Sequence, residues 1–101
     1  MSITMRVLQQ YDIRHEKEFL DLEKEFAALE ARRPDFRKGR RLKPLSAGEP
    51  CNTLVWEAEF EDVEEARSWI AFLGEDSEHE SLFARQAPFF SQVRIEFYEN
   101  L

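Results

Sequence analysis

The chain has 101 residues, a length that fits one domain and leaves too little for a second. Its hydrophobic content of 43% and its nine Phe residues exclude a disordered chain and predict an aromatic-rich core. The net charge of −7 argues against nucleic acid as a partner, because contacts to phosphate supply most of that affinity.

Membrane insertion and export are also not expected from the sequence. No apolar run reaches the roughly 18 residues that a membrane-spanning helix needs. The first six residues show no basic region followed by an apolar one, so we predict no signal peptide. Cys51 is the single cysteine, which rules out an internal disulfide. We therefore expect a cytoplasmic protein with no membrane partner.

The first third of the chain predicts a strand followed by a helix. Apolar and polar side chains alternate over residues 3–13, as in a half-buried strand. Residues 15–33 predict a helix, which Pro34 ends. The positions between its apolar residues are mostly Glu, Asp and Lys, which we interpret as a solvated face. The apolar residues recur at spacings of three and four: Phe19, Leu22, Phe26 and Leu29.

Two further strands are predicted in the middle of the chain. Residues 36–46 form the weaker pattern, in which Gly39 suggests a bulge. Residues 46–50 have the composition of a turn. Residues 52–61 alternate most regularly of all and predict a strand with one apolar face.

The last third predicts a helix in two pieces and a final strand. Asp62 and Glu65 resemble a capping box, and Gly74 suits the end of the helix that they open. A second helical segment runs from Ser77 to about Ala87, before Pro88. Residues 92–99 alternate again and predict the last strand.

The resulting order, β-α-β-β-α-β, is the ferredoxin-like arrangement. We predict an α+β fold over residues 1–101, in which a four-stranded antiparallel sheet carries its helices on one face. The apolar sides of the last two strands should lie under those helices: Leu54, Trp56 and Phe60, and Val93, Ile95 and Phe97.

The other face of the sheet mixes charges with apolar side chains. A solvated face is the simpler interpretation. The alternative, which we prefer, is that two such faces pack together in a homodimer, with Arg–Glu pairs formed between strands and between chains. The face would carry Arg6, Leu8, Gln10, Val55, Glu57, Glu59, Arg94, Glu96 and Tyr98.

Two motifs resemble a known superfamily. Residues 52–60 read NTLVWEAEF and continue into DVEEA at 62–66, which resembles NIPSNAP-like members of the dimeric α+β barrel superfamily. Residues 76–80, DSEHE, resemble the start of the last helix in that superfamily, including its stress-responsive members. The resemblance implies a homodimer. It leaves the activity open, because the superfamily includes cofactor-free monooxygenases, haem-binding enzymes, isomerases and members without a known role.

His79 is the first candidate for chemistry, as a general base or a haem ligand at a helix start. The alternative is a structural histidine. Haem-degrading members of the superfamily use a Trp and a His separated much as Trp69 and His79 are, with an Asn on the first strand. This chain has Gln9 and Gln10 there instead. We predict no cofactor and keep haem binding as an alternative.

Four aromatic residues are candidates for lining a ligand pocket between helices and sheet, where a ring could stack on a flat organic molecule. For the two tryptophans the alternative is a place in the core. The four are Tyr11, Trp56, Trp69 and Phe83.

A basic cluster between residues 32 and 43 holds seven of the fourteen Lys and Arg residues. It could attract an anion. Arg40 or Arg41 could instead point into the barrel and pair with Glu57 or Glu59 of the neighbouring strand or of the partner chain, or the cluster could simply guard a sheet edge. No spacing of His and Cys predicts a metal site.

Taken together, the sequence predicts a homodimer that binds a small ligand, without settling whether it is an enzyme. The alternatives are a cofactor-independent monooxygenase for a small aromatic or apolar substrate, and a haem-binding protein.

Overall fold

Alternating side chains build one antiparallel sheet, as predicted. The computed structural model describes residues 2–101. The strands lie in the order β2-β3-β1-β4, so the first strand in sequence is central and the last is at an edge. Their bounds are β1 Ile3–Tyr11, β2 Arg40–Leu42, β3 Thr53–Phe60 and β4 Phe90–Glu99.

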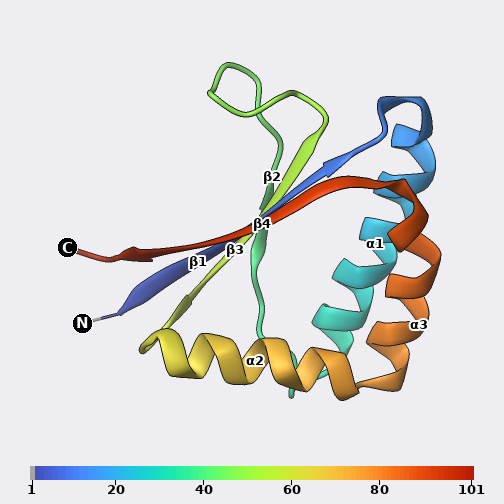
Figure 1. Ribbon diagram of the computed structural model, residues 1–101. Helices are drawn as coiled ribbons and strands as arrows, with labels where there is room; N and C mark the ends of the chain where they lie inside the picture. The colour runs from blue at the N-terminus through green and yellow to red at the C-terminus, as the bar shows by residue number, and fades with distance from the viewer. Residues whose placement is uncertain (1) are drawn as a thin grey trace.

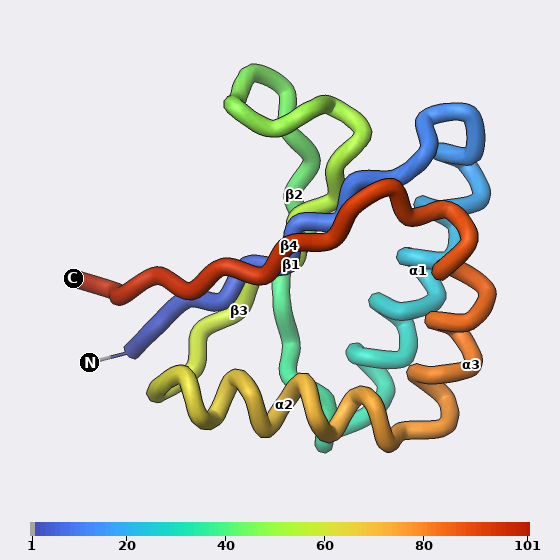
Figure 2. Tube along the Cα trace, in the orientation of Figure 1, coloured from blue at the N-terminus to red at the C-terminus, as the bar shows by residue number. Residues whose placement is uncertain are grey.

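Three α-helices lie on one side of this sheet (Figure 1). Helices α1 and α3 run beside each other, and α2 crosses below the sheet to join them (Figure 2). The predicted cap at Asp62 is present, since its carboxylate accepts a hydrogen bond from the Glu65 N–H. The next helix is capped by Asp76, which accepts a hydrogen bond from the His79 N–H, and not by Ser77, where the sequence suggested a second capping box. The bounds are α1 Glu16–Arg32, α2 Val63–Glu75 and α3 Ser77–Gln86, with short 3₁₀ helices at Ile13–His15 and Ala87–Phe89. This confirms the predicted ferredoxin-like α+β fold.

The predicted strand over residues 36–46 is wrong in length, because β2 covers only Arg40–Leu42. Phe36 is buried with its ring edge-on to Trp69, which turns the chain inward. Gly39 then passes so close to Trp56 that a Cβ would lie 2.2 Å from the indole. The chain can pair with β3 only after Gly39 has passed the Trp56 ring, so β2 begins at Arg40.

The other strand ends also differ from the prediction. β1 stops at Tyr11 rather than residue 13, because the Asp12 carboxylate accepts a hydrogen bond from the Arg14 N–H and starts a 3₁₀ turn. β4 begins at Phe90 rather than residue 92, pairing with Tyr11 across a shift in register.

The apolar core has two separate clusters. One joins β1 and β3 to α2 through Met5, Trp56 and Ala66. The other joins β1 and β3 to α1 through Tyr11 and Phe19, whose rings stack 4.4 Å apart.

The expectation that helices cover β4 is wrong for two of its side chains. Register places Ile95 opposite Val7, and Val7 opposite Trp56, so these residues share the helix side of the sheet. Trp56 is 7% exposed, whereas Ile95 is 43% and Val93 is 48% exposed. The helices pack below β3 and β1 and leave the β4 edge uncovered.

On the opposite, helix-free side, the loop of residues 43–52 covers part of the sheet. Glu49 in this loop forms an ion pair with Arg94 on β4. Since β1 separates β3 from β4, the loop must pass over the middle strands to reach Arg94. Leu8 and Val55, which we predicted for a dimer interface, are therefore buried within one chain.

Candidate functional site

His79 lies on the inner side of α3 within a row of aromatic rings. Its imidazole centroid is 5.2 Å from that of Phe26 on α1 and 6.3 Å from that of Phe83, with which it is nearly parallel. The His79 side chain is 18% exposed, and its Nδ1 lies 3.3 Å from a Glu80 carboxylate oxygen. The imidazole is thus fixed by stacking yet still open to solvent at one edge.

Next to His79 the molecule exposes an apolar surface, which we call the α3–β4 surface: Phe83, Phe90, Val93 and Ile95. Phe83 contacts Phe90 at 5.9 Å between ring centroids, and Phe90 begins the strand that carries the other two residues. Phe83 is 40% exposed, similar to Val93 and Ile95. Of these residues Phe83 contacts the His79 ring directly, and Phe90 connects Phe83 to the strand. Large apolar side chains usually become buried, so three exposed ones on adjoining elements mark a surface suited to an apolar ligand.

Arg33 fixes the start of α3, and hence the position of His79. Its guanidinium lies 2.8 Å from the Asp76 carboxylate, which also caps the helix at the His79 N–H. The bonds from Arg33 and from the His79 backbone hold the pKa of Asp76 below its usual value of 3.8. Asp76 is therefore charged and stabilises the helix N-terminus.

A buried polar network lies between α1 and the sheet. The Arg41 guanidinium reaches from β2 to Glu23 at 2.7 Å and to Glu30 at 3.0 Å. Glu30 also accepts hydrogen bonds from the Trp56 indole and the Gly39 N–H, and Glu23 accepts one from Gln86 on α3. Burial alone would lower the pKa of Arg41, but the two carboxylates raise it above its usual value.

This network corrects the interpretation of α1 and explains the place of Trp56. Glu23 and Glu30 were assigned to a solvated face, yet both are buried. Trp56 lies beside them in the core rather than on the α3–β4 surface. Its role as a ligand contact stays a prediction.

Tyr11 is also buried, and its hydroxyl is already bound. It donates a 2.6 Å hydrogen bond to Glu16, which Lys43 approaches at 3.2 Å. Burial, and then the bond to this carboxylate, raise the pKa of Tyr11 above its usual value. The bonds from Tyr11 and Lys43 lower the pKa of Glu16. A ligand role for Tyr11 stays a prediction.

Trp69 belongs to a different aromatic group from His79. Its ring stacks on Phe72 at 5.4 Å and lies over Trp56 at 6.5 Å. It also lines a shallow groove of about 480 Å³ between residues 34–38 and α2. Trp69 and His79 therefore belong to separate groups of rings, and the joint haem site that the resemblance implies stays a prediction.

The basic cluster of residues 32–43 pairs within the chain. Arg40 contacts Glu57 at 2.8 Å, one of the two carboxylates predicted for it, while Arg41 turns to the helix side. Burial would raise the pKa of Glu57, but hydrogen bonds from Arg40 and Arg6 lower it. Anion binding by Arg40 and Arg41 stays a prediction. The other cations bind Glu78 (Arg32), Asp35 and Asp76 (Arg33), Glu65 (Arg37), Glu16 (Lys43) and three backbone carbonyls (Lys38).

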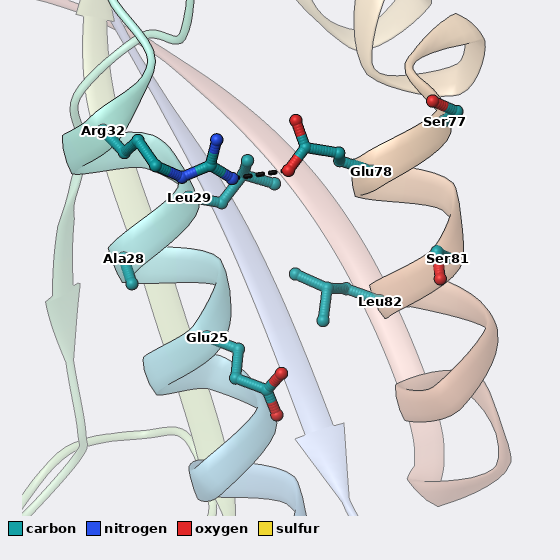
Figure 3. Close-up of a pocket in the computed structure, with 8 residues that line it drawn as sticks. All are labelled: Glu25, Ala28, Leu29, Arg32, Ser77, Glu78, Ser81 and Leu82. Carbon is teal, nitrogen blue, oxygen red and sulfur yellow. Dashed lines mark hydrogen bonds and ion pairs between the residues drawn. The ribbon is translucent and has the colours of Figure 1, made fainter.

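A groove of about 500 Å³ between α1 and α3 is a second candidate site (Figure 3). Arg32 and Glu78 bridge it at 2.5 Å, as the dashed line shows. Its charged groups form ion pairs between the two helices, so they stabilise the packing of α1 against α3 and are already paired. Its lining is Glu25, Ala28, Leu29, Arg32, Ser77, Glu78, Ser81 and Leu82.

Within residues 2–101, no three His, Cys, Asp or Glu side chains are grouped closely enough to hold a metal ion. No helix in the same part of the chain is long and apolar enough to cross a membrane.

The backbone is similar to several solved structures. A NIPSNAP family protein from Agrobacterium tumefaciens matches 99% of this chain and 86% of its own, with a TM-score of 0.82 and 13% identity. The fold is NIPSNAP-like. A NIPSNAP domain protein from Burkholderia xenovorans matches 100% of this chain and 95% of its own (TM-score 0.78, 16% identity).

A protein from Nitrosomonas europaea, named as a candidate antibiotic biosynthesis monooxygenase, shares the same NIPSNAP-like fold. It matches 99% of this chain and 90% of its own, with a TM-score of 0.70 and 11% identity. No protein-family model matches the chain, and no curated protein is similar to it in sequence. Identities this low show the fold and leave the activity open.

His79 and Phe83 were candidates from the sequence, and their roles stay predictions, whereas Val93, Ile95 and the buried Gln86 were not candidates. Val93 and Ile95 were assigned to the core, since a strand pattern does not show which helix covers it. Gln86 gave no signal of its own. It lies seven residues after His79 on the same helix, and that spacing could have placed it on the inner face.

Proposed function

We propose that this protein binds a small, flat, largely apolar molecule on the α3–β4 surface, beside His79. The observation that carries the proposal is the exposure of Phe83, Val93 and Ile95 on the helix side of the molecule. Val93 and Ile95 contribute aliphatic contact and Phe83 a ring face, while His79 offers the ligand one hydrogen-bonding group. A neutral aromatic molecule with a hydroxyl group matches this arrangement.

A fluorescence titration with 1-naphthol tests the proposal. We expect Val93→Ser to weaken binding about tenfold, because the contact of one buried Val is worth roughly 1.5 kcal/mol. Leu45→Ser is the matched control, since Leu45 is 99% exposed on the loop of residues 43–52 and should leave the affinity unchanged. Equal affinities for wild type and Val93→Ser would refute the site.

We further propose that the protein is a homodimer in which the helix-free sheet faces pack together. No helix covers this face in Figure 1, and the loop of residues 43–52 covers only part of it. Tyr98 and Leu42 remain 47% and 37% exposed on it, and both would become buried. A chain of this length also has a modest core, which a partner would enlarge.

Light scattering at micromolar concentration tests the assembly. We expect at least twice the chain mass of 12.0 kDa. A mass equal to one chain would contradict the homodimer.

A second candidate function is a cofactor-independent monooxygenase acting on a hydroquinone. It is favoured by one observation, the partly exposed imidazole of His79 beside the α3–β4 surface. His79 would take the phenolic proton, and the electrons of the phenolate would reduce O₂. One oxygen atom would enter the ring to give a hydroxyquinone, and the other would leave as water.

Oxygen uptake with hydroquinone substrates separates this candidate from simple binding. We expect His79→Phe to keep the ring stacking and to lower the rate at least a hundredfold, the usual order of a lost general base. No uptake by wild type across a broad panel of hydroquinones would reject the oxygenase. Uptake that survives in His79→Phe would reject His79 as the base.

A further inference from the structure

The two edges of the sheet differ in how they are protected. β2 has three residues, and Arg40, Arg41 and Lys43 on or beside it are the kind of charged residues that block pairing with another strand. β4 has ten residues, and within residues 2–101 the only strand it pairs with is β1, so its other edge forms no strand pairing there. The stretch from Gln92 to Glu99 contains no Lys, Pro or Gly, and its charged residues carry both signs, Arg94 against Glu96 and Glu99. Such an edge is a template for another strand.

The sequence of β4 is complementary to itself when the strand is reversed about Ile95. In that antiparallel register Ile95 faces Ile95 of the second copy, and Val93 faces Phe97 of the second copy. On the other side of the sheet, Arg94 faces Glu96 of the second copy, and the two-fold axis repeats this contact. Within its own chain Arg94 already pairs with Glu96 at 2.8 Å and with Glu49, so the second copy would extend this network of charges. Cross-strand apolar pairs and opposite charges both stabilise antiparallel sheets.

The space needed for this pairing is present. The high exposure of Val93 and Ile95 shows that the chain's own helices do not cover β4 on the helix side. A paired strand lies beside β4 in the plane of the sheet rather than above it. The α3–β4 surface would therefore stay open and be extended by Phe97 of the second copy.

We propose that β4 is an interaction surface for a second copy of this chain, with two β4 strands pairing antiparallel about Ile95. The two sheets join into one of eight strands. This contact is distinct from the packing of helix-free faces, and it requires neither that packing nor a bound ligand.

Disulfide cross-linking tests the pairing and its register. In a Cys51→Ser background, Ile95→Cys places two thiols on the two-fold axis, where facing Cα atoms are about 4.5–5.5 Å apart and a disulfide forms readily. Ser91→Cys is the control on the same strand, with its thiols roughly 27 Å apart in this register. With copper–phenanthroline as the oxidant, we expect Ile95→Cys to form a disulfide-linked two-chain product at least ten times faster than Ser91→Cys does.

Cross-linking of Ile95→Cys no faster than Ser91→Cys overturns the proposal. A second experiment covers the case in which Ile95→Cys fails to fold. Copies with Arg94→Cys are mixed with copies with Glu96→Cys, and the mixed disulfide should exceed either symmetric product. An excess of a symmetric product overturns the register. Neither cross-linking result depends on 1-naphthol binding. The strand pairing can therefore be refuted without refuting the ligand site, and the reverse also holds.

Discussion

Arg41 is the residue on which the interior beside α1 depends. Its guanidinium is the cation that two buried carboxylates, Glu23 and Glu30, share. The cost of burying a carboxylate is offset only while such a partner is present. Arg40, one position earlier, pairs with Glu57 while 71% of its own side chain is exposed.

This contrast gives a prediction for two adjacent residues. Arg41→Leu should lower the free energy of unfolding by about 3 kcal/mol, because it leaves two buried carboxylates without a cation. Arg40→Leu should change it by less than about 1 kcal/mol, as expected for an exposed pair. Urea unfolding followed by circular dichroism measures both. If both variants lose the same free energy of unfolding, the buried network contributes no more to stability than an exposed ion pair.

The sequence could not show this role, because the pattern of α1 alone cannot separate a buried glutamate from a solvated one. Glu23 and Glu30 follow apolar neighbours at ordinary spacings. Their burial is decided by Arg41, which lies eleven or more residues further along the chain. His79, by contrast, could be named as a candidate in advance because it stands at a predicted helix start, and Phe83 follows four residues later on the same face of the helix.

At the scale of the elements, the start of α3 depends on the charge of Asp76. Its pKa is lowered by Arg33 and by the His79 N–H. A carboxyl group with a lower pKa in the folded state binds fewer protons there than in the unfolded chain. Its stabilising effect is thus complete above the unfolded value near 3.8 and is lost as the pH falls through the folded value.

We therefore expect thermal unfolding midpoints to fall as the pH drops below about 4. Asp76→Asn should show a smaller fall, because the amide still caps the helix but does not titrate. The unfolding midpoints of wild type and Asp76→Asn should therefore become similar at acidic pH. If the midpoints of the two proteins fall in parallel with pH, the ionisation of Asp76 does not contribute to the stability of the folded state. Differential scanning calorimetry between pH 7 and pH 2 measures the effect.

The strand bounds show which features a local sequence pattern can predict and which depend on tertiary contacts. β1 and β3 were predicted to within two residues because both alternate without interruption and lie centrally in the sheet. β2 was overestimated, since the burial of Phe36 and the approach of Gly39 to Trp56 are tertiary contacts that stop the strand. The apolar face of β4 was predicted correctly as a face but not as an exposed one. Which strand a helix covers depends on the placement of α2 and α3.

At the scale of the whole molecule, the ferredoxin-like order followed from the sequence, and the NIPSNAP-like backbone agrees with it. The helices cover one side of β3 and β1, the loop of residues 43–52 covers part of the other side, and the β4 edge remains open. This uneven coverage exposes the α3–β4 surface, and it also makes β4 available to a second copy.

The function proposed for this molecule depends on a small apolar ligand binding at the α3–β4 surface. The most direct test is the nitrogen-15 NMR spectrum of the protein during a titration with 1-naphthol. We expect the largest shift changes at residues 79–83 and 93–95, with much smaller changes along the groove between α1 and α3. Shift changes concentrated in that groove, or none at any residue, would contradict it.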